Sequence, residues 1–509
     1  MVSHVSTIAF QGLNAIDVDV QSMITNGLPA FSIVGLPDKA VAESKERVRS
    51  SLYSMGLSLP PKRITINLSP ADLQKEGSHY DLPIALGLLV GLKVLSQEEV
   101  SEFIAFGELG LDGRITAVSG ALIAAVHANS LNRGIICSEA SGPEAAWAGD
   151  MSIIAARTLL DLVNHFKGTQ VLASPQPKLT DYQETEKILS DIRGQSLAKR
   201  ALEIAAAGSH HLLMIGPPGA GKTMLAQRLP SLLPPLEAEE ALEVSMVHSL
   251  CGQLTQGSIV HRRPFRAPHH SASHVSLVGG GHRAIPGEIT LAHHGVLFLD
   301  EMPEFSRNSL ESLRQPLEDK IITVARANHH VTYPAKFQLV AAMNPCRCGF
   351  AYDASRACRR IPQCINDYLL KISGPFMDRI DLCVSVPEVK FQDLQAAPSS
   401  PSDLLEIKAR ILQARLLQKN RYQHFPKMSQ TNADVPLKFL EEITPLSTEG
   451  TALLQKASHE LKLSARSYHR LLRVARTIAD LNADSTLGYE HLAEAIFLKT
   501  QGYFSSQSF

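Results

Sequence analysis

The segment that most constrains this chain is residues 216–223, GPPGAGKT, which fits the phosphate-loop pattern G-x-x-x-x-G-K-[ST]. An apolar run at residues 212–215 precedes it and is typical of a short buried strand, and the residues from Lys222 onward favour a helix. Glycines allow backbone N–H groups to close around phosphate oxygens, and the dipole at the start of a helix attracts the same negative charge. The pattern therefore predicts an ATP site. The residues expected to contact the nucleotide or its Mg²⁺ are Gly216, Pro217, Pro218, Gly219, Ala220, Gly221, Lys222 and Thr223.

A second strand with a carboxylate at its end is supplied by residues 295–301, GVLFLDE. Its continuous apolar run is expected of a central parallel strand that is buried on both faces. Asp300 and Glu301 follow at the carboxyl end of that strand, where open α/β sheets bind ligands. We expect Lys222 to contact the β- and γ-phosphates, Thr223 and Asp300 to hold Mg²⁺, and Glu301 to polarise the attacking water. The alternative is a pair of solvated acids, which leaves their pairing with a phosphate loop unexplained.

Length, charge and cysteine content set the broad class. A chain of 509 residues suggests two to four domains, and its formal net charge of −1 means that any nucleic-acid surface must be local, for example inside a ring. The first ten residues lack the basic start and apolar core of a secretion signal, and the longest apolar run, residues 82–92, is too short to span a bilayer. Seven cysteines in such a chain favour the reducing cytoplasm. We therefore expect a cytoplasmic protein with no membrane partner.

Pro- and Ser-rich stretches divide the chain into three parts. Short strands and helices alternate over residues 1–168, residues 169–185 read as a linker, and an α/β ATPase core is expected over residues 186–392. From residue 403 to residue 509 the pattern is helical. Near the start of the core, the turn at Gly194 and Gln195 precedes an Ala-rich helix, and we expect this turn and helix to lie over the adenine.

Three polar residues beyond the second motif are candidates for ATP chemistry. Asn344 ends the apolar strand FQLVAAMN, where it can position the lytic water or sense the γ-phosphate, although a strand-terminal turn also favours Asn. Arg379 lies between two aspartates and could reach the γ-phosphate of a neighbouring subunit, or form an ion pair within its own chain. Arg466 begins a basic amphipathic helix and is placed to close over the nucleotide.

A hairpin is predicted between the two nucleotide strands, where KIITVARA and HHVTYPAKF alternate apolar and polar residues. An arginine at a hairpin tip can hold phosphates without reading bases, so we expect DNA contacts here; the alternative is a set of solvated charges. The residues concerned are Arg326, His329, His330 and, at the return, Lys336. A second DNA path would use Arg263 and Arg266.

Two groups of possible zinc ligands occur in the chain. Residues 263–294, dense in Gly, Pro, His and Arg, carry two histidine pairs, but no further ligand is evident, so we favour a loop or pore element over a metal site. The second group could surround one structural Zn²⁺ tetrahedrally, or be reduced thiols on a loop. Its members are Cys346, Cys348, Cys358 and Cys364.

The motifs GPPGAGKT, GVLFLDE, AAMNPC, SGPFMDRIDL and LSARSYHRLLRVARTIADL, in this order, resemble the magnesium-chelatase-like AAA+ ATPases of the ComM/YifB family. The segments KEGSHYDLPIALGLL and ITAVSGALIAAVHA look like a Lon-protease-like domain of the ribosomal S5 domain 2 type. His79 and Leu122 occupy the positions that match the protease's serine nucleophile and lysine base, and Ser78 has no lysine to accompany it. We therefore expect an α+β scaffold without proteolytic activity, followed by a P-loop module with a helical lid.

The resemblance implies a hexameric ATPase that encircles DNA, single-stranded or branched, and drives branch migration during recombination in natural transformation, with recombination proteins as possible partners. It also implies that Asn344 is the first sensor, Arg379 a finger acting in trans and Arg466 the second sensor. One departure concerns zinc: the family carries a second C-x-C near Cys358, whereas this chain has Arg360 in place of its second cysteine. The alternatives are a chelatase motor subunit, for which no porphyrin-binding or metal-insertion feature is evident, and an ATP-dependent protease, which the missing dyad disfavours.

Overall fold

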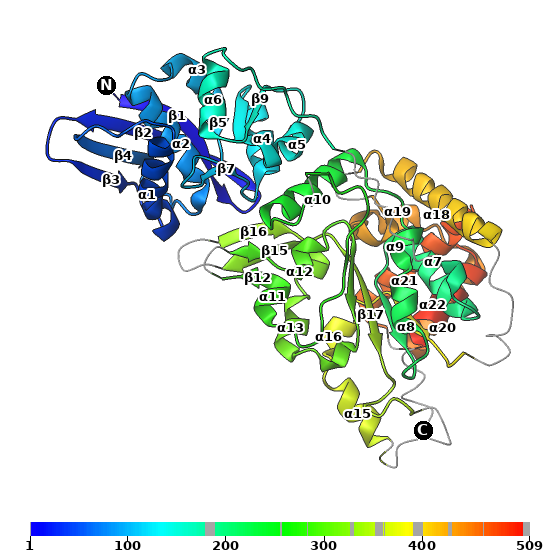
Figure 1. Ribbon diagram of the computed structural model, residues 1–509. Helices are drawn as coiled ribbons and strands as arrows, with labels where there is room; N and C mark the ends of the chain where they lie inside the picture. The colour runs from blue at the N-terminus through cyan, green and yellow to red at the C-terminus, as the bar shows by residue number, and fades with distance from the viewer. Residues whose placement is uncertain are drawn as a thin grey trace.

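The structure is a computed structural model that describes residues 2–178, 189–254, 257–281, 284–325, 330–351, 360, 362–389, 401–425, 430–461 and 463–501. Three bodies follow one another: an N-terminal unit (β1 to α6), a central unit (η4, Leu189–Asp191, to β18) and a helical unit (α18 to α22) (Figure 1). The α/β class predicted from the sequence is confirmed. The limits 1–168, 169–185, 186–392 and 403–509 are retained as proposed domain limits.

The described strands of the N-terminal unit form a seven-stranded sheet in the order β3-β4-β2-β1-β5-β8-β9. Strands β1 and β2 make a long antiparallel hairpin in which Gln11 faces Asn14, so Gly12, with a φ of 69°, and Leu13 form the turn. Helix α2 is apolar on every side and packs on these two strands. The strands are β1 (Val2–Gln11), β2 (Asn14–Thr25), β3 (Ala30–Val34), β4 (Arg63–Ser69), β5 (Phe103–Ala105), β8 (Gly134–Ser138) and β9 (Ile153–Ala156), with a separate ribbon of β6 (Glu108–Leu109) and β7 (Ile115–Thr116). The helices are α1 (Lys39–Ser54), α2 (Asp81–Gly91), α3 (Gln97–Ser101), α4 (Ala121–Ser130), α5 (Gly142–Ala145) and α6 (Leu159–Phe166).

A parallel sheet organises the central unit, with its described strands in the order β11-β14-β17-β10-β18. The three inner strands are almost fully buried, which explains why they read as continuous apolar runs. The strands are β10 (Leu212–Ile215), β11 (Phe265–Arg266), β14 (Val296–Leu299), β17 (Gln338–Met343) and β18 (Leu382–Ser385). The helices are α7 (Ser196–Gly208), α8 (Lys222–Ala226), α9 (Leu229–Leu232), α10 (Ala238–Leu250), α11 (His274–Val278), α12 (Glu288–Leu291), α13 (Arg307–Ser312), α14 (Pro316–Asp319), α15 (Gln363–Leu369) and α16 (Gly374–Met377).

Among its described residues, the central unit has two hairpins. The predicted one is confirmed: β15 (Ile321–Ala325) pairs with β16 (His330–Pro334) in a register that sets Ala325 opposite His330. A shorter one joins β12 (Gly279–Gly280) to β13 (Ile285–Pro286). The longer hairpin lies beside the N-terminal unit (Figure 1). Val331 of β16 is so close to the β1–β2 turn that a Cβ added to Gly12 would come within 2.9 Å of it.

The helical unit covers α7 and β18 and shares one apolar core with that side of the sheet. A buried carboxylate in this unit, Asp480, accepts hydrogen bonds from Arg421, Arg476 and Asn432. Among the residues that the structure describes, no helix combines the length and apolar character needed to cross a membrane. The helices are α18 (Pro401–Tyr422), α19 (Leu440–Ile443), α20 (Thr448–Glu460), α21 (Ala465–Leu481) and α22 (Tyr489–Thr500).

Candidate nucleotide site

The phosphate loop joins β10 to α8, as predicted. Gly219 and Gly221 adopt φ values of 78° and 88°, and a Cβ on Gly216 would lie 2.0 Å from the carbonyl oxygen of Val386, so each glycine is required by the backbone path. Lys222 is buried and lies inside this loop. Its Nζ donates to the carbonyl oxygens of Gly216 at 2.7 Å and Pro217 at 2.9 Å. Burial lowers the pKa of Lys222, and nearby Asp300 and Glu301 act in the opposite direction.

Neighbouring parallel strands bring the other polar residues to the same edge of the sheet. Because Ile215 pairs with Met343 and Leu299 pairs with Ala341, the residues that follow these strands leave the sheet together. The Oδ1 of Asn344 accepts a hydrogen bond from Lys222 Nζ at 3.1 Å. The Thr223 hydroxyl donates to Asp300 Oδ2 at 2.7 Å. A hydroxyl and a carboxylate in contact beside a phosphate loop are the oxygen ligands that Mg²⁺ prefers, so these residues fit the expected metal–nucleotide complex.

Glu301 lies next to this pair in a strained conformation. Its φ of 50° is left-handed, a state that costs roughly 1–3 kcal/mol for a residue with a side chain and is found at functional sites. The carboxylate is exposed, and its Oε2 lies 3.5 Å from Nδ1 of His270. No motif in the sequence predicts this histidine as part of the site. The only signal was its place in the long loop before β14, which gives no indication of the side chain that it contacts.

The turn before α7 lies against the phosphate loop. Gly194 and Gln195 both have left-handed φ values, 61° and 55°. Gln195 Nε2 donates to the carbonyl oxygens of Pro387 at 2.7 Å and Ala220 at 3.4 Å, which joins the loop to the chain beyond β18. The turn is therefore beside the expected nucleotide position, while contact with the adenine remains a prediction.

Arg379 and Arg466 are brought together by Glu318 of α14. Arg379 Nη2 lies 3.0 Å from Glu318 Oε2, and Arg466 Nη2 lies 2.7 Å from Oε1 of the same carboxylate. Arg379 is buried and also donates to the carbonyl oxygens of Arg314 and Pro375. In a single chain, Arg379 therefore has the intrachain ion pair that we considered as its alternative role.

Three of the four predicted zinc-ligand thiols are close together. The Sγ atoms of Cys346 and Cys348 are 3.0 Å apart, and the Sγ atoms of Cys346, Cys348 and Cys364 all lie within 4.8 Å of one another. Cys358 lies outside the described residues. Three thiols at this spacing could ligate one Zn²⁺, and the fourth ligand stays open.

The residues predicted to contact DNA have different surroundings. Arg326 and His329 lie outside the described residues, and His330 is exposed at the hairpin. Lys336 Nζ donates to Gln430 Oε1 at 2.8 Å, toward the helical unit. The two arginines of the second path form ion pairs within the chain: Arg263 with Glu240 at 2.7 Å and Arg266 with Glu288 at 2.6 Å.

Comparison with known families and proteins accounts for nearly the whole chain. Family models described as "Subunit ChlI of Mg-chelatase", "Magnesium chelatase, subunit ChlI" and "Magnesium chelatase, subunit ChlI C-terminal" match residues 20–141, 188–394 and 402–499. More distantly, the DNA replication licensing factor mcm6 of Dictyostelium discoideum is 22% identical over 226 residues, 41% of this chain and 23% of that protein.

Two bacterial proteins match over almost their full length. The competence protein ComM of Haemophilus influenzae is 43% identical over 497 residues, which cover 96% of this chain and 95% of that protein. The uncharacterized protein YifB of Escherichia coli is 41% identical over 495 residues, 97% of this chain and 96% of that protein. On this evidence the chain belongs to the ComM/YifB family of magnesium-chelatase-like AAA+ proteins.

Proposed function

We propose that this protein is an ATP-driven DNA translocase, a helicase that works as a hexameric ring and promotes branch migration of recombination intermediates in natural transformation. The observation that carries the proposal is the β15–β16 hairpin, which lies in the chain between β14 and β17, the two strands whose carboxyl ends are followed by Asp300 and Asn344. The relative named as a competence protein and the one named as a DNA replication licensing factor support this choice.

ATP hydrolysis would follow from the residues around the phosphate loop. Mg²⁺, when bound, neutralises charge on the β- and γ-phosphates, and Thr223 and Asp300 would hold it. Lys222 would exchange its carbonyl partners in the loop for phosphate oxygens. Glu301 would accept a hydrogen bond from the attacking water, and Asn344 would fix that water in line with the γ-phosphate.

A neighbouring subunit would complete the site. We propose that Arg379 stabilises the γ-phosphate in trans and that Arg466 responds to the nucleotide as the second sensor. Both arginines share Glu318, so assembly would require that this carboxylate release at least one of them. Glu318 is thereby a candidate for the residue that keeps the finger inactive in an isolated subunit.

The DNA contacts are proposed on the hairpin, with Arg326, His329 and His330 toward the ring's pore. Arg263 and Arg266 carry less of this proposal, because each would have to leave a carboxylate before it could bind a phosphate. Lys336 has the same limitation, since Asp434 lies 3.9 Å from its Nζ. The protein is expected to act in the cytoplasm, where recombination proteins could be its partners.

A structural Zn²⁺ bound by Cys346, Cys348 and Cys364 is proposed as a further component. Cys346 is fully buried and contacts the small apolar cluster around Ile365, so a metal there would fasten the segment after Asn344. Zinc content of the purified protein, compared with a Cys346→Ser variant, tests this assignment directly.

Two other functions have less support. A chelatase motor subunit is favoured by the three family models alone, and ATP turnover that does not respond to DNA would support it. Proteolysis is disfavoured by two residues at the protease positions: His79 is buried with its Nε2 bonded to the carbonyl oxygen of Ile8, and Leu122 is fully buried.

The test of the proposed function is ATP turnover with and without single-stranded and branched DNA. We expect DNA to raise the turnover of the wild-type protein several-fold and to leave that of a hairpin variant, Arg326→Ala, unchanged. An equal response in both proteins would place the DNA path elsewhere.

A further inference from the structure

Helix α10 connects the N-terminal unit to the start of β14, and its last turn lies against Gly120 and Glu144 of the N-terminal unit. The N–H of Gly120 donates to the carbonyl oxygen of Ser249 at 3.0 Å, and the Ser249 hydroxyl donates to Glu144. Glu144 also accepts the N–H of Leu122 at 3.0 Å, the residue at the position of the protease's lysine base. The C-terminal end of α10 is thereby fixed to the N-terminal unit.

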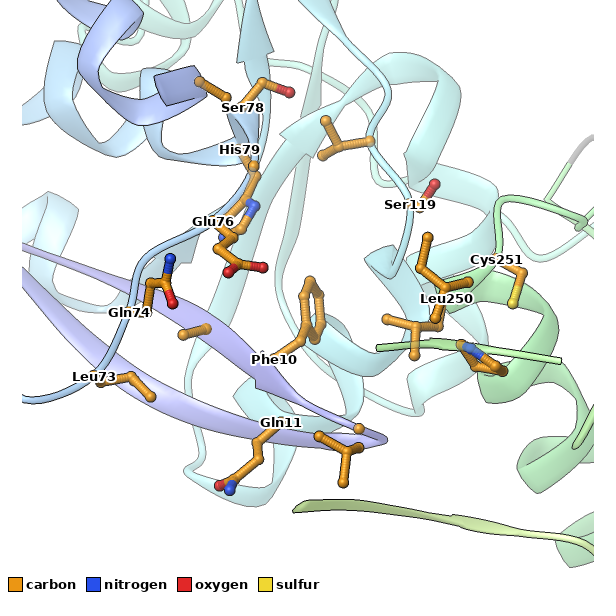
Figure 2. A pocket seen from close by; sticks show the side chains of 18 of the residues that line it. Phe10, Gln11, Leu73, Gln74, Glu76, Ser78, His79, Ser119, Leu250 and Cys251 are labelled. Atoms are coloured by element: carbon orange, nitrogen blue, oxygen red, sulfur yellow. The ribbon is translucent and has the colours of Figure 1, made fainter. Parts of the chain in front are cut away.

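A cavity with a volume of about 510 Å³ adjoins this junction and is shown in Figure 2. Leu250 and Cys251, at the end of α10, line one side together with Ser119, and His79 and Glu76 of the N-terminal unit lie across from them. A Cβ on Gly252 would approach Ser119 Oγ to 2.8 Å, so the chain leaving α10 fits closely against this cleft.

The first half of α10 holds His294. Its Nδ1 lies 3.1 Å from Glu240 Oε1, and its Nε2 lies 2.8 Å from Glu243 Oε2. Both ring nitrogens face carboxylates, so the protonated ring can donate to both at once. Burial alone would lower the pKa of His294, but the hydrogen bonds to Glu240 and Glu243 raise it above its ordinary value.

The neighbouring His293 argues for a proton rather than a metal ion at this cluster. Its Nδ1 accepts the backbone N–H of Lys336 at 3.0 Å, so in the neutral ring the proton is on Nε2, which donates to Glu243 Oε2 at 3.2 Å. A metal ligand must offer an unprotonated nitrogen, and this ring would then lack a proton on either side. Burial lowers the pKa of His293 to about 4.

His294 lies at the start of β14, the strand that is followed by Asp300 and Glu301, and we call this position the root of β14. His294 has a left-handed φ of 53°, its N–H donates to the carbonyl oxygen of Lys336 at 2.6 Å, and its own carbonyl accepts from Arg263 Nη1 at 2.9 Å. Gly295 follows, then β14, and then Asp300 and Glu301. Any shift of this root moves a strand that ends at the ATP site.

We propose that His294 is a positioning residue for ATP hydrolysis, a clamp that ties the root of β14 to α10 and through α10 to the N-terminal unit. Through this clamp, a change in the contacts of Ser249 with Gly120 and Glu144 would alter the positions of Asp300 and Glu301. The inference rests on the proposed ATPase and is independent of the proposed DNA motor. The proposal gives the protease-like N-terminal unit a role, because this unit holds the C-terminal end of α10 in place.

The pH dependence follows from the proton at His294. The raised pKa means that the clamp is complete below the ordinary histidine value of about 6.5 and weakens as pH rises through the folded-state pKa. The same cluster contains the other charges that face this ring. They are Glu240 and Glu243 of α10, His293, Arg263, Lys320, Lys336, Arg415 and Asp434.

The experiment uses the full-length protein with His294→Asn, which tolerates a left-handed φ but does not titrate. Without DNA, we expect kcat for ATP to fall about two- to thirtyfold with KM and nucleotide Kd nearly unchanged, the range for mutations along a coupling path. The wild-type protein should lose kcat with rising pH through the His294 transition, and the variant should not. Glu239→Gln, an exposed acid on the same helix, is the matched control.

The contact between α10 and the N-terminal unit is tested by Ser249→Ala. This variant should also lower kcat, and in the double variant it should add little to the effect of His294→Asn. Hydrogen exchange of the β14 amides gives a readout without turnover: they should exchange faster in His294→Asn than in the Glu239→Gln control. This measurement separates a failure of the inference from a failure of the proposed function.

Three results would overturn the proposal. The first is an unchanged pH profile and kcat in His294→Asn, and the second is β14 exchange equal to that of the control. The third is one equivalent of Zn²⁺ that survives replacement of the cysteines and is lost in His294→Asn, because the cluster would then be a metal site.

Discussion

Asp381 is the buried carboxylate at which the central and helical units meet, and its removal should be strongly destabilising. Its Oδ1 lies 2.6 Å from Nη1 of Arg470 on α21, and its Oδ2 accepts the N–H of His211 at 2.8 Å. Arg470 Nη1 also donates to the carbonyl oxygen of Arg379 at 2.8 Å, so this pair joins the helical unit to the proposed finger. Asp381 is 4% exposed.

The magnitude follows from this burial. Asp381→Ala leaves the guanidinium of Arg470 and a backbone N–H without their carboxylate, and breaking a buried pair in this way costs roughly 3–5 kcal/mol. At roughly 2–4 °C per kcal/mol for a unit of this size, Tm should fall by about 6–20 °C. Removing both partners in Asp381→Ala/Arg470→Leu should cost less, because no charge stays unpaired.

The sign of the pH dependence is also determined. Burial alone would raise the pKa of Asp381, but Arg470, His210 and His211 lower it well below its ordinary value. Its contribution to stability is therefore present above the unfolded-state pKa of about 3.9 and is lost only as pH falls through the folded-state pKa. From neutral pH down to about pH 5, the difference between wild type and Asp381→Ala should stay constant.

Thermal unfolding at pH 7, followed by circular dichroism, measures the effect, with the exposed Asp367→Ala as the control. A Tm within 2–3 °C of the wild type, about 1 kcal/mol, would refute the reasoning. A double variant less stable than Asp381→Ala would refute the pairing with Arg470.

Three further predictions concern the motor. Glu301→Gln should bind ATP with little loss of affinity and hydrolyse it at least a hundredfold more slowly, which corresponds to about 2.7 kcal/mol of activation barrier. Lys222→Ala should instead lose nucleotide binding. Measurements of equilibrium nucleotide binding and of phosphate release distinguish the two variants. Arg379→Ala should be slow alone, yet rings mixed with Lys222→Ala should recover activity, and no recovery despite confirmed subunit exchange would contradict a role in trans. Arg326→Ala should weaken DNA binding about equally for all sequences and reduce the slope of log K against log salt by about 1, which titrations at several salt concentrations would check.

The ATP site was predictable because its parts are local motifs joined by one rule of sheet topology. The loop, Asp300 and Asn344 each follow an apolar run, and parallel strands end at the same edge. The contacts of Thr223 with Asp300 and of Lys222 with Asn344 agree with that reasoning.

Long-range side-chain partners were not predictable, because no period or motif encodes them. Glu243 and His294 are 51 residues apart, and only the folded position of α10 brings them together. The same holds for the pairing of Arg266 with Glu288. The sequence around Arg266 is basic and indicates a DNA surface, but it gives no sign of this acidic partner. The replaced protease residues indicated a lost activity, but they carried no sign that Ser249 would be seated beside them.

The most direct test of the proposed DNA motor is migration of a preformed four-way DNA junction by the purified wild-type protein with ATP and Mg²⁺. We expect ATP-dependent conversion of the junction to its products, none with Glu301→Gln, and strongly reduced conversion with Arg326→Ala. Robust ATP hydrolysis by the wild-type protein with no junction migration and no stimulation by DNA would show that the ATPase does not drive branch migration.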